Sequence, residues 1–253
     1  MKILAWLVGA AVLPALAANY YFDNLAGKDS NPGTTSVAPW KSLSKFKTIK
    51  VSAGDSILLG RGSNWIGESL YVSATGTSDH PVVFSAYGDP TAPRPHIDNK
   101  GALFVLNRSR HVVVENLELS GAHGGCVEMR DSSNAHIVVQ SIEAHDCGCG
   151  ISMTGTDITV RGNHVHDGHM VVNTPNTMDD DYGATGIGFS RLDGCKVHGN
   201  RLENLVAPSY DYGVDGGALE FWKTTRHCDV QGNFAFNANG FTEYGGQKGD
   251  SSV

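Results

Sequence analysis

The chain has 253 residues, an ordinary apolar fraction of 40%, and 31 glycines, which is an unusually large number. Its formal net charge of −7 argues against a nucleic acid as partner, because phosphate binding needs a basic surface. The length suffices for one large domain with a substantial core. Glycines scattered among short apolar runs indicate many tight turns between short strands.

Residues 1–18 have the features of a secretory signal peptide. Lys2 supplies a positive start, residues 3–16 are almost entirely apolar, and Ala15-Leu16-Ala17 is a small-x-small cleavage site. The apolar run is shorter than the roughly 20 residues that span a membrane. We therefore expect a secreted, extracellular protein without a membrane-spanning segment.

Residues 19–98 form a head that does not repeat. Its apolar runs are short and β-branched, as in residues 56–59 and 81–84, and turn residues separate them. This pattern predicts strands joined by turns, with one short helix over residues 42–50. We expect this region to be an N-terminal cap with the first coils of a larger fold.

Residues 99–253 repeat themselves. Five segments end on the same valine position, with steps of 25, 21, 37 and 33 residues between Val114, Val139, Val160, Val197 and Val230. A second short apolar strand precedes each return, as in residues 127–129 and 219–221. Repeats of this length built from several short strands are typical of a solenoid whose stacked coils bury a continuous core. We predict an all-β protein, a right-handed parallel β-helix with a cap and with repeats over residues 99–253. Whether further coils follow these repeats stays open.

Two residue types recur at fixed positions of the repeat. Asn163, Asn200 and Asn233 follow their valines by three residues, which predicts an asparagine ladder at a tight turn and no chemistry. Cys195 and Cys228 each precede a valine by two residues, so we expect them to form a disulfide between adjacent coils. Cys126 is expected to pair with Cys147 or Cys149, which leaves the other free.

The head and coils together resemble the secreted right-handed β-helix proteins of the pectate-lyase-like superfamily. The motifs that carry the resemblance are Tyr20-Tyr21-Phe22-Asp23, Asp29-Ser30-Asn31-Pro32-Gly33-Thr34, Pro39-Trp40-Lys41-Ser42-Leu43, Gly54-Asp55-Ser56-Ile57-Leu58 and Ala86-Tyr87-Gly88-Asp89-Pro90. The resemblance implies the fold, and more broadly a polysaccharide lyase, epimerase or glycoside hydrolase. It transfers no catalytic residue, because one β-helix scaffold hosts several chemistries.

The two long steps contain insertions at residues 166–180 and 203–210, and both insertions run into the motif Asp-Tyr-Gly. Insertions of a solenoid gather on one face, often the binding face. Stacking would bring Asp181 and Asp211 about 5 Å apart. With Asp179 and Asp180 they form a candidate calcium site, since calcium prefers several oxygen ligands, and Asp181 and Asp211 are also candidate catalytic residues that could bind the substrate instead. The alternative is a solvated acidic loop.

A second carboxylate pair lies close by. Glu220 follows Leu219, and Glu243 aligns with it on the next coil. Because apolar residues flank Glu220, strand alternation should turn its carboxylate outward, where the pair could serve as acid and base. The alternative is a half-solvated strand face, and Glu128 occupies the same position in an earlier coil.

Other side chains near these carboxylates complete the candidate site. His166 is a candidate acid or base beside the aspartates, although the spacing His164-x-His166-x-x-His169 fits no standard metal motif. Lys223 is the candidate base of a lyase. The candidate substrate-binding residues are Tyr182, Tyr212, Asp215, Trp222 and Arg226.

The sequence favours a secreted, monomeric enzyme that cleaves a polysaccharide in a groove along the β-helix. Two mechanisms remain open: calcium-assisted β-elimination, and hydrolysis by paired carboxylates. The alternative from another class is a non-catalytic carbohydrate-binding or surface adhesion protein, in which the loop carboxylates would be dispensable.

Overall fold

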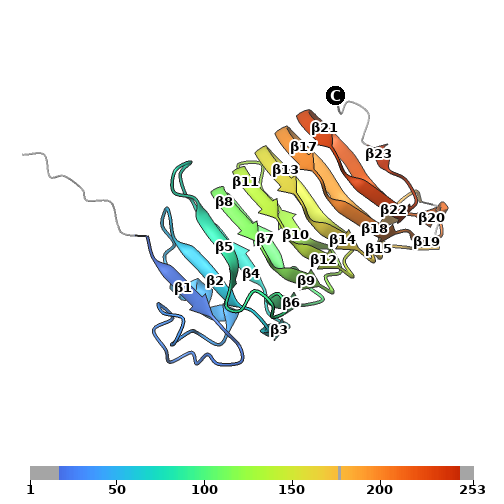
Figure 1. The fold of residues 1–253 in the computed structure, drawn as a ribbon. Helices are drawn as coiled ribbons and strands as arrows, with labels where there is room; N and C mark the ends of the chain where they lie inside the picture. Colours follow the sequence, from blue (N-terminus) through green and yellow to red (C-terminus); the bar gives the residue numbers. More distant parts are fainter. Residues whose placement is uncertain (1–16, 176–177, 246–253) are drawn as a thin grey trace, which may run out of the picture.

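The computed structural model describes residues 17–175 and 178–245, so the expected signal peptide lies almost entirely outside the described residues. The described chain winds into a three-sided solenoid in which each coil adds a short strand to each of three parallel faces (Figure 1). The fold prediction is confirmed. No helix in the described part of the chain is long and apolar enough to cross a membrane.

Along the chain, successive strands of a coil belong to face one, face two and face three in turn. Face one contains β4 (Leu70–Val72), β7 (Phe104–Leu106), β10 (Gly125–Met129), the first halves of β13 (Cys149–Arg161), β17 (Thr185–His198) and β21 (Gly217–Gln231), and β23 (Thr242–Gly245). Face two contains β1 (Asn19–Phe22), β2 (Ser56–Gly60), β5 (Val82–Tyr87), β8 (Arg110–Glu115), β11 (Ala135–Gln140) and the second halves of the three long strands. Face three contains β3 (Asn64–Ile66), β6 (His96–Asp98), β9 (Glu118–Ser120), β12 (Glu143–His145), β14 (His164–His166), β18 (Arg201–Leu205) and β22 (Phe234–Ala238).

The repeat register predicted from the valines is the register of face two. Val114 pairs with Val139, Val139 with Val160, Val160 with Val197, and Val197 with Val230. The first four side chains are fully buried. Each coil therefore covers the apolar side chain of its neighbour, as a solenoid requires.

The cap differs from its prediction in one detail. The expected helix over residues 42–50 is a short 3-10 helix, Leu43–Thr48, which buries Leu43 and Phe46 against the end of the core. Six residues give too few backbone hydrogen bonds for a stable α-helix in isolation, so packing of these two side chains sets its form.

The asparagine ladder is present at the turn between faces two and three. Oδ1 of Asn200 accepts hydrogen bonds from the backbone N–H and the side-chain amide of Asn163, and Asn233 does the same for Asn200. Asn200 also donates to the carbonyl of Val160. The ladder thus satisfies buried backbone groups of three successive coils.

Two disulfides join adjacent coils. Cys195 and Cys228 are linked as predicted, with a Cα–Cα distance of 4.4 Å. Cys126 is linked to Cys147 at 5.9 Å, and Cys149 is the free thiol. The two alternatives for Cys126 are thereby resolved.

The two long insertions are β-hairpins on the side where face three leads into face one. The first pairs β15 (Met170–Val172) with β16 (Tyr182–Gly183), and the second pairs β19 (Ala207–Ser209) with β20 (Gly213–Asp215). They project at the C-terminal end of the solenoid (Figure 1). Their strands position both Asp-Tyr-Gly motifs.

Asn200→Ala should lower the free energy of unfolding by about 1–3 kcal/mol, because it leaves buried donors and an acceptor without partners. Chemical denaturation monitored by circular dichroism measures this loss. Asn239→Ala is the matched control, since that exposed side chain makes one long hydrogen bond of 3.4 Å. Equal stability of the two variants would contradict a supporting role for the ladder.

Candidate functional site

A row of outward positions crosses face one beside the two hairpins. In register, Glu128 is followed by Ser152, Gly188, Glu220 and Glu243, one from each successive coil. Adjacent strands of a sheet lie about 4.8 Å apart, so Glu220 and Glu243 are neighbours, as predicted.

Glu220 points away from the core, as expected, but it is buried, so the alternative of a half-solvated strand face does not describe it. Its exposed fraction is 6%. Its Oε2 accepts hydrogen bonds from the hydroxyl of Thr185 at 2.8 Å and from the indole N–H of Trp222 at 3.2 Å. The neighbouring side chains cover the carboxyl and hold it in one orientation.

This environment favours the protonated form of Glu220. Burial is the main cause that raises its pKa to about 7, and the charges of Glu243 and Asp215 add to the effect, while the bonds from Thr185 and Trp222 oppose it. The pKa of Glu243 is also raised, by burial and by Asp215. A carboxyl that titrates near neutrality beside other carboxylates can exchange a proton at physiological pH.

The row position next to Glu220 is a glycine. A Cβ atom at Gly188 would make ordinary contacts at 3.4 Å with Sγ of Cys149 and 3.8 Å with Thr185. Its backbone conformation therefore does not require glycine, and the row has no side chain between Ser152 and Glu220. Sequence reasoning missed Thr185, Gly188 and Cys149, although aligning Cys149-Gly150-Ile151 with Thr185-Gly186-Ile187 would have placed them in adjacent coils.

Asp181 and Asp211 come together as predicted, and the reason is a reciprocal clasp between the two hairpins. Oδ2 of Asp181 accepts hydrogen bonds from Ser209 and from the backbone N–H groups of Tyr210 and Asp211. Oδ2 of Asp211 accepts from the backbone N–H groups of Asp180 and Asp181. Each loop thus presents its amides to the carboxylate of the other.

The clasp favours the ionised form of Asp181. Burial alone would raise the pKa of this carboxyl, but the backbone N–H groups of Thr174, Asp211 and Tyr210 and the Ser209 hydroxyl outweigh burial and hold the pKa below its usual value. The alternative of a solvated acidic loop therefore does not describe Asp181, which is buried. Ligand atoms of Asp180, Asp181 and Asp211 lie within 4.8 Å of one another, while Asp179 is exposed beside them.

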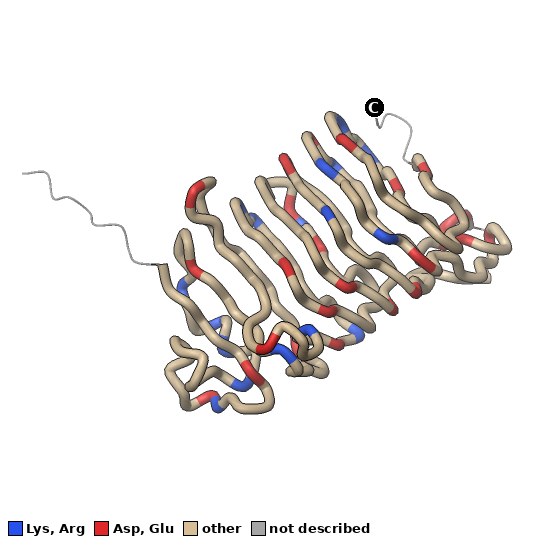
Figure 2. Tube along the Cα trace, viewed as in Figure 1, with Lys and Arg blue, Asp and Glu red and all other residues tan. Residues whose placement is uncertain are grey.

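Asp215 connects the clasp with the Glu220 row. Its pKa is raised mainly by burial and then by the charges of Asp181 and Asp211, and Asp215 in turn contributes to the raised pKa values of Glu220 and Glu243. Figure 2 shows acidic positions gathered at the hairpin end of the last coils. The two carboxylate groups predicted separately form one acidic strip, which we define as Asp181, Asp211, Asp215, Glu220 and Glu243.

Aromatic side chains accompany this acidic strip. Tyr182 and Tyr212 follow the two clasp aspartates directly and are 50% and 55% exposed, and Trp222 is 38% exposed. Tyr210 is 65% exposed on the same hairpin as Tyr212. Exposed rings at these positions are available for contact with a ligand.

The two predicted cations do not join the acidic strip. Lys223 is exposed at the bend of β21 between faces one and two, where its backbone φ is +57°. Arg226 belongs to the half of β21 on face two and lies 4.0 Å from Asp193. The bend of the long strand separates both side chains from the carboxylates that precede them.

His166 does not lie beside the aspartate pair, which corrects that prediction. It is on β14 of face three, where its ring stacks on His145 with centroids 4.9 Å apart and its Nδ1 bonds to Asp167 at 2.7 Å. The chain passes from β14 into the hairpin only after this point, so sequence proximity did not imply contact.

The outer side of face two carries a groove that sequence reasoning did not identify. Its volume is about 530 Å³, and His111, His136, Asp157 and Lys196 are among the residues that line it. The rings of His111 and His136 stack with centroids 4.4 Å apart. The groove lies on face two, away from the acidic strip on face one.

The chain belongs to the right-handed β-helix family, whose description is "Right handed beta helix region" and whose pattern matches residues 101–248, more than half of the sequence. Among curated proteins, it is similar to a lacto-N-biosidase of Bifidobacterium longum subsp. longum, with 41% identity over 85 residues. That match covers 32% of this chain and 5% of the relative, so the chain spans a small part of the protein it matches.

Solved structures share the fold. A mannuronic acid specific polysaccharide family 6 lyase from human gut microbiota matches with a TM-score of 0.51 and 13% identity, covering 89% of this chain and 51% of that one. An alginate lyase from Paenibacillus matches with a TM-score of 0.50 and 15% identity, covering 78% and 73%. At these identities the likeness establishes the β-helix and not the reaction.

The buried Glu220 carboxyl should make stability depend on pH. Its folded-state pKa of about 7 lies above the unfolded value, so its contribution is fully present below about pH 4 and is lost as the pH rises through 7. Relative to Glu220→Gln, the wild-type free energy of unfolding should fall by about 3 kcal/mol between pH 4 and pH 8. Urea denaturation at a series of pH values measures this difference.

The control is Glu128→Gln, at the same row position but ion-paired with Arg130 at 2.5 Å. This variant should keep the wild-type pH profile. Parallel pH profiles for wild type and Glu220→Gln would show that folding leaves the pKa of Glu220 unchanged.

Proposed function

We propose that this protein is an extracellular carbohydrate-active enzyme that hydrolyses a glycosidic bond on face one. The observation that carries the proposal is Glu220, a covered and hydrogen-bonded carboxyl among other carboxylates, with a glycine, Gly188, at the next position of the row. Glycoside hydrolysis requires one protonated and one ionised carboxyl on either side of the scissile bond. Glu220 and its neighbours supply both states at neutral pH.

In this mechanism Glu220 is the general acid. The hydroxyl of Thr185 and the indole of Trp222 orient its carboxyl, and burial keeps it protonated until it gives its proton to the leaving oxygen. Glu243, one coil further, is the candidate nucleophile or base, because neighbouring rungs hold carboxylates at a separation compatible with a retaining pair. Asp215 adds negative charge, which stabilises a positively charged, oxocarbenium-like sugar in the transition state.

The charge of the acidic strip favours hydrolysis over β-elimination. A lyase must neutralise the carboxylate of a uronic acid and stabilise the anion that forms. Among the described residues, Glu220 has no cationic partner, while Lys223 is exposed at the bend and Arg226 faces Asp193. We therefore propose a neutral glycan as substrate, since a polyanion would be repelled by the strip.

Two further findings support this proposal. The local similarity is to a protein named as a lacto-N-biosidase, and the exposed rings of Tyr182, Tyr212 and Trp222 suit stacking on sugar faces. Secretion agrees with the two disulfides, because such bonds persist in oxidising compartments.

We propose that calcium stabilises the two hairpins and takes no part in catalysis. Oδ2 of Asp181 already accepts three hydrogen bonds from the opposite hairpin. We therefore assign Asp181 to the contact between the hairpins and not to the ion. Asp180 and Asp211 would supply the hard oxygen ligands, with water completing the six to eight oxygens that calcium takes. Such a site should be weak, with a dissociation constant of about 10⁻⁴–10⁻³ M.

Calcium at millimolar concentration should raise the melting temperature of the wild type, since a ligand that binds the folded state stabilises it. Differential scanning calorimetry with calcium and with a chelator measures the shift. Asp211→Asn should abolish the calcium effect, whereas Asp181→Asn should lower the melting temperature in either condition. An unchanged calcium response in Asp211→Asn would remove calcium from this cluster.

Glu220→Gln should reduce turnover of a cleaved glycan by about 10²–10⁴-fold, the usual contribution of general acid–base catalysis. The assay measures new reducing ends and ultraviolet absorbance on neutral oligosaccharides and on uronic acid polymers. Wild-type activity should also fall above about pH 7, as Glu220 loses its proton. Glu128→Gln is the control and should retain wild-type turnover.

The outcomes separate the alternatives. New reducing ends without absorbance support hydrolysis, whereas an unsaturated, absorbing product would identify a lyase. Normal turnover in a folded Glu220→Gln protein would remove Glu220 from the mechanism. Glycan binding that is unaffected by substitution of the strip, without any cleavage, would identify a binding or adhesion protein.

A further inference from the structure

Face three carries a second group of titratable side chains, which the proposed hydrolysis does not use. Two outward rows run along it in register. The first row contains His96, Glu118, Glu143 and His164, and the second contains Ser120, His145, His166 and Glu203. Histidines and carboxylates therefore meet both along and across the coils.

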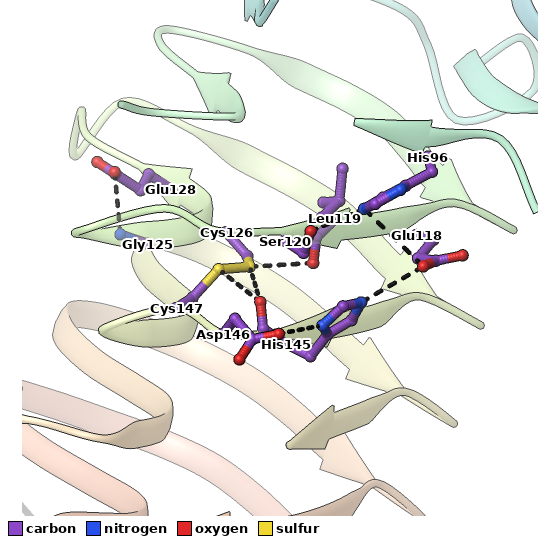
Figure 3. The surroundings of a disulfide bond; sticks show 10 residues. All are labelled: His96, Glu118, Leu119, Ser120, Gly125, Cys126, Glu128, His145, Asp146 and Cys147. Carbon is purple, nitrogen blue, oxygen red and sulfur yellow. Dashed lines mark hydrogen bonds and ion pairs between the residues drawn. A yellow bond between two sulfur atoms is a disulfide. The ribbon is translucent and has the colours of Figure 1, made fainter. Parts of the chain in front are cut away.

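In the coils nearer the N-terminus, the histidines of these rows are paired with carboxylates. Figure 3 shows His145 between Asp146 and Glu118, with His96 facing the same Glu118 carboxylate. Nδ1 of His145 is 2.7 Å from Asp146, and Nε2 is 3.4 Å from Glu118. Burial lowers the pKa of His145, but these two carboxylates outweigh burial and raise it. Both ring nitrogens of His145 therefore have a carboxylate partner within hydrogen-bond distance.

One coil further toward the C-terminus, the equivalent histidine is His166. It has the same contact with an aspartate, but its other ring nitrogen makes no hydrogen bond within the described residues. Nδ1 of His166 is 2.7 Å from Asp167, as Nδ1 of His145 is from Asp146. Nε2 of His166 is buried and makes no hydrogen bond within the described residues. The nearest carboxylate oxygen, Oε1 of Glu143, is 3.6 Å away. A buried ring nitrogen without a partner is costly and needs an explanation.

The side chains around this nitrogen leave further ligand atoms available. Nε2 of His164 is 2.8 Å from Glu203, which leaves Nδ1 as its second ring nitrogen. Arg94 takes Oε2 of Glu143 at 2.6 Å, so Oε1 remains for another ligand. One ligand atom each from Glu143, His164 and His166 lies within 4.8 Å of the others, so the three side chains are close enough to share one ion.

We propose that Glu143, His164 and His166 form a binding site for a divalent transition-metal ion, with Zn²⁺ as the expected occupant. Two imidazoles and one carboxylate, with a fourth position open to water or a ligand, are a ligand set that zinc uses. Each histidine donates its other N–H to a carboxylate, Asp167 or Glu203, which is the second-shell arrangement typical of metal-bound histidine. Calcium is disfavoured because it prefers oxygen ligands.

The test uses the full, tag-free protein after dialysis against a chelator. Isothermal titration with Zn²⁺ should give one site per chain, and Co²⁺ should give the visible d–d absorption of a low-symmetry, four- or five-coordinate ion. His166→Ala should abolish both signals. Asp167→Asn, which keeps all three ligands, should weaken Zn²⁺ binding by about 10–100-fold. Circular dichroism and melting curves establish that each variant is folded.

Two controls make the result specific. His198→Ala removes a histidine on face two that pairs with Asp229 at 3.0 Å, and it should bind as the wild type does. Glu220→Gln should also bind Zn²⁺ normally, so failure of the proposed hydrolysis would leave this inference intact. Absence of Zn²⁺ binding in the wild type, or equal binding by folded His166→Ala, would overturn it.

Discussion

The in-register parallel pairing between successive coils is the constraint on which the other features depend. Each strand forms backbone hydrogen bonds with the strand one coil away, and the pairing puts equivalent residues about 4.8 Å apart. The same register buries the valines of face two, builds the asparagine ladder and brings Cys195 next to Cys228. A shift of one residue would turn every apolar side chain outward, so the core fixes the register of the polar rows as well.

The acidic strip illustrates how this constraint concentrates like charges. Stacking brings Glu220 next to Glu243, and the hairpins add Asp215, Asp181 and Asp211. Two different physical solutions relieve the repulsion. Hydrogen bonds from backbone N–H groups of the opposite hairpin stabilise the negative charges of the clasp aspartates, whereas burial shifts Glu220 toward its protonated form. The first solution holds the hairpins in place, and the second leaves a carboxyl able to transfer a proton.

The polar rows of face three have the same coil-to-coil register as the acidic strip, but their side chains have different neighbours. On face three, histidines lie beside carboxylates of the same and of the neighbouring row, so they form ion pairs and their rings stack. His145 and His166 occupy equivalent positions, yet Glu118 completes the bonding of the first and Glu143 lies farther from the second. One backbone plan thus produces a closed ion pair in one coil and an unpaired ring nitrogen in the next.

The sequence by itself determined the β-helix, its register, the asparagine ladder and the Cys195–Cys228 bond, because these follow from which residue recurs at which position of a coil. It also predicted that Asp181 meets Asp211 and that Glu220 meets Glu243. Three features came only from the tertiary structure. They are the hydrogen bonds of backbone amides in the clasp, the burial of Glu220 beside Thr185 and Trp222, and the position of His166 on face three. Those outcomes depend on where loops fold back and where a long strand bends, and no periodicity encodes such non-local contacts.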